Sequence, residues 1–356
     1  MDFITIPCTT RNGAKREFEW DADESSLLLD KCEIVEVDLR PLANAKSLKT
    51  LSISANRIVQ IDLTPLAGCE ALESLNLFKN PLTAIDLTPL SSCVRLQELN
   101  VGAGALTVID LTPLSRCTDL RRLRLFGNKL VQVELHPLAA CSALETLELE
   151  NNSLHTIDLS PLKRCARLVQ LNLMYNALER IDLSPLSACR ELKYLYLQSN
   201  SLKSIDLSPL SECSSLTILR LGGNELAAVD LDPLSKCRGL RRLELAMNGI
   251  DSLDLTPLSS CMELRALDVA GNALKTLDLA PLAECTSLEE LYLFSDHPHE
   301  NAFTELDLSP LFRLRDLEDL GLPEKVDLVA DEDLKRLKAK SPAVEELIEE
   351  ERIHWK

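Results

Sequence analysis

Cysteine thiols are the most chemically versatile side chains in this sequence, because a thiolate can bind a metal, attack an electrophile or form a disulfide. Ala45 and Leu314 occupy the cysteine place in outer copies of a 24-residue pattern, which indicates a buried apolar side chain. We therefore predict packed thiols; the alternatives are a metal ladder or a disulfide chain, which would need the same strained geometry in every unit. Ten of the twelve cysteines follow this spacing: Cys69, Cys93, Cys117, Cys141, Cys165, Cys189, Cys213, Cys237, Cys261 and Cys285.

A row of aspartates is a second candidate for chemistry, since aligned carboxylates can bind calcium. The row begins each copy of a pentapeptide such as Asp62-Leu63-Thr64-Pro65-Leu66. No second acidic residue recurs at a fixed offset to complete a coordination shell, so we expect each carboxylate to accept backbone N–H bonds in the turn that follows. The other members are Asp38, Asp86, Asp110, Glu134, Asp158, Asp182, Asp206, Asp230, Asp254, Asp278 and Asp307.

Histidines give weak support to a metal or catalytic site. His297 and His299 lie in the insertion at 295–304, where no third ligand is evident for zinc; this loop could contact a partner or be a plain surface loop. His136 and His155 stand in different repeats without a nucleophile partner. The sequence also has no glycine-rich phosphate loop and no nucleophile elbow. We predict that the chain is not an enzyme and binds no metal or cofactor.

A 24-residue repeat supplies the elements that would position these residues, with the general form LxxLxLxxNxLxxIDLxPLxxCxx. The alternating leucines are typical of a strand, and a strand this short can bury its apolar face only in a stack of units. Thirteen strand-like segments occur, from 27–29 to 320–322. Ser or Thr precedes proline in eight copies, which predicts a helix N-cap followed by one short helical or 3₁₀ turn.

An asparagine follows most of the strand-like segments. Its amide can donate to and accept from the backbone where the chain turns, so buried polar groups stay satisfied. Gly104 and Asp296 interrupt this row, and Cys32 takes the place in the first unit. The members are Asn56, Asn80, Asn128, Asn152, Asn176, Asn200, Asn224, Asn248 and Asn272.

This pattern resembles the leucine-rich-repeat superfamily over roughly residues 24–322, and its IDLSPL stretch is similar to the short repeats of internalin-type and phosphatase-regulator-type proteins. The resemblance implies an α/β fold: a curved right-handed solenoid with a parallel sheet on the concave face and short helical or 3₁₀ turns on the convex face. We assign 1–23 to an N-terminal cap, 24–326 to the array, and 327–356 to a C-terminal cap of one or two amphipathic helices.

Aromatic, methionine and arginine side chains gather beside the strand leucines, where they point away from the core. These residue types are enriched in interface cores, so we predict a partner-binding surface on the concave face. Drift on a tolerant sheet surface is the alternative. Some of the arginines could pair with Glu98, Glu148, Glu150 and Glu244 on adjacent strands. The predicted set is Phe78, Arg122, Arg124, Phe126, Met174, Tyr175, Tyr194, Tyr196, Arg220, Arg242, Met247, Tyr292 and Phe294.

The net charge of −18 disfavours nucleic acid and anionic membranes as partners. No apolar run has the length of a membrane span and no signal peptide is evident, so we expect a cytoplasmic protein. We predict a non-enzymatic scaffold or adaptor for a partner protein. Alternatives are a regulatory subunit of an enzyme such as a protein phosphatase, a structural or engineered array without a natural ligand, or self-association through the concave face.

Overall fold

The computed structural model describes residues 3–294, 300–337 and 340–356. The chain forms two compact units, Met1–Ala177 and Leu178–Lys356. The first unit begins with an antiparallel hairpin of β1 (Phe3–Thr10) and β2 (Lys15–Asp21), and β1 also pairs with β4 (Ile34–Val37). Ile6 and Trp20 are buried in this small sheet, whereas Phe3 stays exposed.

Parallel strands of three residues follow in the first unit, and neighbouring strands of this unit are aligned at a step of 24 residues, as Leu51 is with Leu75. The leucine at the centre of each strand is buried because only that side chain points toward the core. The strands are β3 (Ser26–Leu28), β5 (Thr50–Ser52), β6 (Ser74–Asn76), β7 (Glu98–Asn100), β8 (Arg122–Arg124), β9 (Thr146–Glu148) and β10 (Gln170–Asn172).

The second unit continues the pattern with six such parallel strands among its described residues. Each is aligned with the next at the same 24-residue step, except that β17 follows the insertion and pairs with β15. They are β11 (Tyr194–Tyr196), β12 (Ile218–Arg220), β13 (Arg242–Glu244), β14 (Ala266–Asp268), β15 (Glu290–Tyr292) and β17 (Asp319–Gly321).

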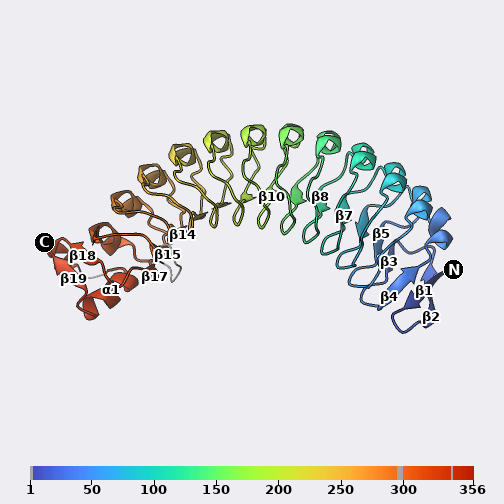
Figure 1. Ribbon diagram of the computed structural model, residues 1–356, viewed down its shortest axis with the longest axis horizontal. Coiled ribbons are helices and arrows are strands. Elements are labelled where there is room, and N and C mark those ends of the chain that lie inside the picture. Colours follow the sequence, from blue (N-terminus) through green and yellow to red (C-terminus); the bar gives the residue numbers. More distant parts are fainter. Residues whose placement is uncertain (1–2, 295–299, 338–339) are drawn as a thin grey trace. The chain divides into compact units, whose positions relative to one another are not determined.

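A 3₁₀ turn lies between successive strands, on the side of its unit opposite the strands (Figure 1). Each turn begins just after a buried leucine, has proline near its start, and buries a second leucine. In the first unit the turns are η1 (Arg40–Asn44), η2 (Thr64–Gly68), η3 (Thr88–Ser92), η4 (Thr112–Arg116), η5 (His136–Ala140) and η6 (Ser160–Arg164). In the second they are η7 (Ser184–Ala188), η8 (Ser208–Glu212), η9 (Asp232–Lys236), η10 (Thr256–Ser260), η11 (Ala280–Glu284) and η12 (Ser309–Arg313).

Residues 327–356 contain strands as well as helix. Strands β16 (Glu305–Asp307), β18 (Asp327–Ala330) and β19 (Ile353–Trp355) form a separate parallel sheet in the second unit. Between β18 and β19 lie the 3₁₀ turn η13 (Glu332–Arg336) and the helix α1 (Pro342–Glu349). The helical prediction for this segment is therefore confined to α1 and η13. Its apolar residues at 328–330 instead extend the sheet that β16 begins.

The asparagine row satisfies buried backbone groups, as predicted. The Asn80 amide donates to the carbonyls of Ile53 (2.8 Å) and Leu77 (3.0 Å) and accepts from the Ile58 N–H (3.1 Å). The place assigned to Asp296 in the sequence is filled by Asn301, whose amide accepts from the Leu274 N–H at 3.1 Å. The insertion shifts the row by five residues, which spacing alone could not locate.

The aspartate row caps the turns, as predicted for its carboxylates, but the predicted Ser/Thr N-caps are wrong. The carboxylate of Asp62 accepts the backbone N–H of Thr64 at 2.9 Å. Hydrogen bonding from the side chain and the backbone of Thr64 lowers the pKa of Asp62. Thr64 itself is the first residue of η2, and the N-cap is Leu63, which makes no side-chain cap bond. Threonine thus stands one residue too late to cap the turn, and the aspartate two residues earlier does so instead.

The cysteine row is buried, as predicted. The ten repeated cysteines have no exposed surface. Thiols of this row point at backbone carbonyls of preceding repeats: Cys93 lies 3.3 Å from the carbonyl oxygen of Leu66, and Cys213 lies 3.4 Å from that of Leu186. Burial in this setting raises the pKa of the Cys93 thiol to about 12. These cysteines therefore behave as small core side chains with a weak hydrogen bond.

Candidate functional site

We call the solvent-facing side of the parallel strands the strand face of its unit. It is formed by the residues that flank the strand leucines and by the described residues at the second and third places after each strand. All thirteen predicted site residues lie on it, six in the first unit and seven in the second. Tyr175 and Met247 are the most exposed, at 56% and 44%. The other eleven are half-buried.

Two phenylalanines meet on the strand face of the first unit. The ring centres of Phe78 and Phe126 lie 5.6 Å apart, although a whole repeat separates the two residues. Gly102 of the intervening repeat makes this possible, because a Cβ atom there would lie 2.8 Å from the Phe126 ring. These two rings therefore pack on the backbone and on each other, so part of their role is structural.

The arginines of the first strand face are paired with glutamates on neighbouring strands, as predicted. Arg122 forms an ion pair with Glu98, and Arg124 lies 3.1 Å from Glu148. Glu150 has no such partner: its Oε2 atom is buried and accepts no hydrogen bond from the described residues. Burial raises the pKa of Glu150 to about 7; Glu148 adds to this increase and Arg124 opposes it.

We predict that Glu150→Gln stabilises the protein at pH 8 by about 1–2 kcal/mol after allowance for solvent screening. Because the folded-state pKa of Glu150 lies above its unfolded value, the native state keeps this carboxyl protonated to a higher pH than the unfolded state does. The wild type should therefore lose stability relative to the variant as pH rises from about 4.5 to about 7. Urea denaturation across this range measures the difference, with the exposed Glu70→Gln as control. Parallel pH profiles for wild type and Glu150→Gln would contradict this prediction.

A tyrosine pair begins the strand face of the second unit. The rings of Tyr194 and Tyr196 are parallel, with centres 6.4 Å apart. The Arg220 guanidinium on the next strand lies 5.5 Å from the centre of the Tyr196 ring, within range of a cation–π contact. Burial raises the pKa of the Tyr196 hydroxyl, which remains protonated at neutral pH. The three side chains form one preorganised aromatic and cationic surface.

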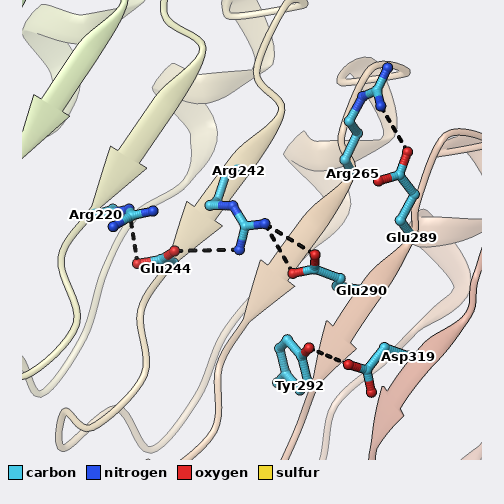
Figure 2. Close-up of polar contacts among 8 residues, drawn as sticks. All are labelled: Arg220, Arg242, Glu244, Arg265, Glu289, Glu290, Tyr292 and Asp319. Carbon is cyan, nitrogen blue, oxygen red and sulfur yellow. Dashed lines mark hydrogen bonds and ion pairs between the residues drawn. The ribbon is translucent and has the colours of Figure 1, made fainter.

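An ion-pair ladder continues from Arg220 across the second strand face (Figure 2). Glu244 lies 3.2 Å from Arg220 and 3.5 Å from Arg242. Arg242 also reaches Glu290 at 3.0 Å, passing over β14, where the register places Ala266. A large side chain at 266 would obstruct this contact, so the small alanine permits an ion pair between strands that are not adjacent.

Two carboxylates at the far end of this ladder have no arginine partner among the described residues. Asp319 accepts a hydrogen bond from the Tyr292 hydroxyl, which raises the pKa of Tyr292 to about 12 (Figure 2). Burial raises the pKa of Asp268 to about 6, although a bond from the Ala270 N–H opposes the shift. Sequence reasoning missed Asp268, Glu290 and Asp319 because it selected aromatic, methionine and arginine side chains. Their places beside the strand leucines were the available signal.

Among the described residues, no group of three or more His, Cys, Asp or Glu side chains is arranged so that it could hold a metal ion. His297 and His299, in the predicted insertion loop, lie outside the described residues. In the part of the chain that is described, no helix has both the length and the apolar character needed to span a bilayer.

Comparison with known protein families identifies the repeat. The family model described as "Leucine rich repeat" matches residues 25–82, 118–178, 166–226 and 190–250, which is more than half of the chain. The chain belongs to the leucine-rich-repeat family. The predicted leucine-rich-repeat solenoid is confirmed, since parallel strands alternate with 3₁₀ turns as in solved members of the family. Proteins of this family are generally non-enzymatic binding scaffolds.

Solved leucine-rich-repeat structures are similar in fold. A leucine-rich-repeat protein of Leptospira interrogans is 23% identical, with a TM-score of 0.74 over 89% of this chain and 80% of that one. An internalin of Listeria monocytogenes is 24% identical, with a TM-score of 0.63 over 84% and 87%. The functional domain of InlJ from the same organism, described as including a cysteine ladder, is 22% identical, with a TM-score of 0.66 over 86% and 64%. No curated protein sequence matches this leucine-rich-repeat chain.

Proposed function

We propose that this leucine-rich-repeat protein is a non-enzymatic scaffold that recognises a partner protein through its strand face. The thirteen residues predicted from the sequence are the proposed contact set, with Tyr194 and Tyr196 as its anchors in the second unit. Rigid strands would hold these anchors in place, so that little conformational entropy is lost on binding. A reducing, intracellular location is part of the proposal, and the row of buried cysteines supports it.

The observation that carries the proposal is the presence of bulky, exposed side chains where the fold favours glycine. Tyr175 and Met247 have left-handed φ angles of 53° and 55°. The same place is glycine in three other repeats, at Gly127, Gly223 and Gly271, and alanine, asparagine, serine or lysine in others. A side chain in this conformation costs about 1 kcal/mol or more, and neither residue recovers it by burial. Binding is a reason to keep such residues; packing is not.

We therefore expect Tyr175→Gly with Met247→Gly to keep a stability within about 1 kcal/mol of wild type, since relief of strain offsets the entropy of glycine. The same variant should bind a partner about tenfold more weakly or worse. Affinity capture from extract, with quantified bound proteins, compares it with wild type and with Tyr194→Glu plus Tyr196→Glu. Val94→Glu with Met262→Glu, which alters exposed apolar residues outside the strand face, is the matched control.

A protein retained by wild type and by the control, but lost by both strand-face variants, would support the proposal. If that partner is an enzyme whose activity changes on binding, the chain is its regulatory subunit. Equal retention by all four proteins would overturn it. Retention of a second copy of this chain alone would replace a foreign partner by self-association.

A further inference from the structure

A basic groove lies in the first unit, at the edge of the strand face, where the loops that follow the strands meet the β1–β2 hairpin. It consists of two hollows of about 580 and 620 Å³ that share Lys31 and Glu33 in their walls. The first hollow adds Arg11 and Arg16 from the β1–β2 hairpin, and the second adds side chains from the loops after β5 and β6. A ligand lying along the groove could therefore contact the hairpin and successive repeats together.

The charge of the groove is opposite to that of the whole chain, which has 56 acidic and 38 basic residues. Five cations line it, Arg11, Arg16, Lys31, Arg57 and Lys79, against the single carboxylate of Glu33. Glu33 is already paired with Arg57, at 2.8 Å. The other four cations have no ion-pair partner among the described residues. The side chains that line the groove therefore carry a net positive charge, and the concave surface concentrates their field.

Backbone hydrogen bonds fix the positions from which these cations project. Lys31 donates its N–H to the Ser54 carbonyl at 2.9 Å, and Lys79 donates to Gly102 at the same distance. Arg11 donates to the Glu33 carbonyl at 2.9 Å, which ties the hairpin to the first repeat. Since the loops are held in this way, only side-chain rotamers would be ordered on binding, and the loss of entropy is limited.

The lining also indicates the class of ligand. Arginine forks bind carboxylates in a bidentate manner. No aromatic side chain lines either hollow, which disfavours the base stacking on which single-stranded nucleic acids depend. The lining of the second hollow includes Ala55, Pro81 and Ala103, whose apolar surface suits a peptide better than a fully charged polymer. We propose that the basic groove binds an acidic segment of a partner protein.

Fluorescence anisotropy with a labelled peptide of alternating glutamate and alanine tests this proposal on the full-length chain. The test variant is Lys31→Glu with Lys79→Glu. The matched control, Lys46→Glu with Lys163→Glu, places the same charges at exposed sites of the first unit outside the groove. We expect binding by wild type that weakens with salt, about tenfold weaker binding by the test variant, and a change within about twofold for the control.

Circular dichroism melting confirms that all three proteins are folded. Absence of peptide binding at low salt, or equal weakening in both variants, would overturn the proposal. Tighter binding of polyphosphate or of a single-stranded oligonucleotide than of the acidic peptide would overturn the assignment to a protein segment. Since the strand-face variants leave the basic groove intact, they should bind the peptide like wild type, which separates this test from that of the proposed function.

Discussion

Asn80→Leu is expected to lower the free energy of unfolding of the first unit by about 3–5 kcal/mol. Asn80 is 1% exposed, and its amide joins three backbone groups, the carbonyls of Ile53 and Leu77 and the N–H of Ile58. Leucine has a similar volume but can satisfy none of them. It also excludes the water that could replace the amide, so three buried polar groups would be left without partners.

Gln60→Leu is the matched control, because it introduces the same side chain in place of an exposed carboxamide. Its effect should stay within about 0.5 kcal/mol. Urea denaturation monitored by circular dichroism gives the global effect, and hydrogen exchange shows whether opening is confined to neighbouring repeats, as expected in a repeat array. A loss below about 1 kcal/mol for Asn80→Leu would show that the asparagine row is not a major source of stability.

Gly104 shows how the protein tolerates one natural gap in this row. A Cβ at 104 would lie 2.7 Å from the Asn128 side-chain oxygen, so asparagine does not fit there without rearrangement. The N–H of Leu82, which an asparagine at 104 would otherwise accept, donates to the Asn80 carbonyl at 2.8 Å instead. The interruption is visible in the sequence, but the replacement hydrogen bond depends on the backbone geometry of the turn, which residue spacing does not reveal.

The fold was predictable because one spacing determines several features at once. A 24-residue step aligns leucine with leucine in neighbouring strands before the insertion, and it also aligns the asparagine, aspartate and cysteine rows. Errors arose where a difference of a few residues decides the outcome. Thr64 was predicted to cap η2 and is its first residue, and the insertion moved the asparagine place from Asp296 to Asn301.

The candidate site was predictable in part. Pairing between adjacent strands follows from register, which is why Arg124 and Glu148 could be matched from sequence. Contacts that skip a strand do not follow from it: Arg242 reaches Glu290 only because Ala266 lies between them. The raised pKa of Asp268 likewise depends on burial and on like charges from two strands. Such features need side-chain geometry.

The cysteine row leads to the second large effect, which is an expected loss of thiol reactivity of about a hundredfold to a thousandfold in the folded protein. Burial raises the pKa of Cys141 and Cys237 to about 12. At pH 8 the thiolate fraction is then about 10⁻⁴, against about one tenth for a thiol with a pKa of 9. Because the reagent must also reach a side chain with no exposed surface, the difference in rate should be at least this large.

Titration with a disulfide reagent, in buffer and in denaturing urea, measures this difference. Cys32 is the only cysteine that is not buried, so it should account for the rapid phase in the folded protein, and all twelve should react after unfolding. Cys32→Ala should remove the rapid phase and leave the ten repeated thiols protected. Rapid modification of several of these ten thiols in the folded variant would contradict a packed row, and a shortfall below twelve after unfolding would revive the alternative of disulfide bonds.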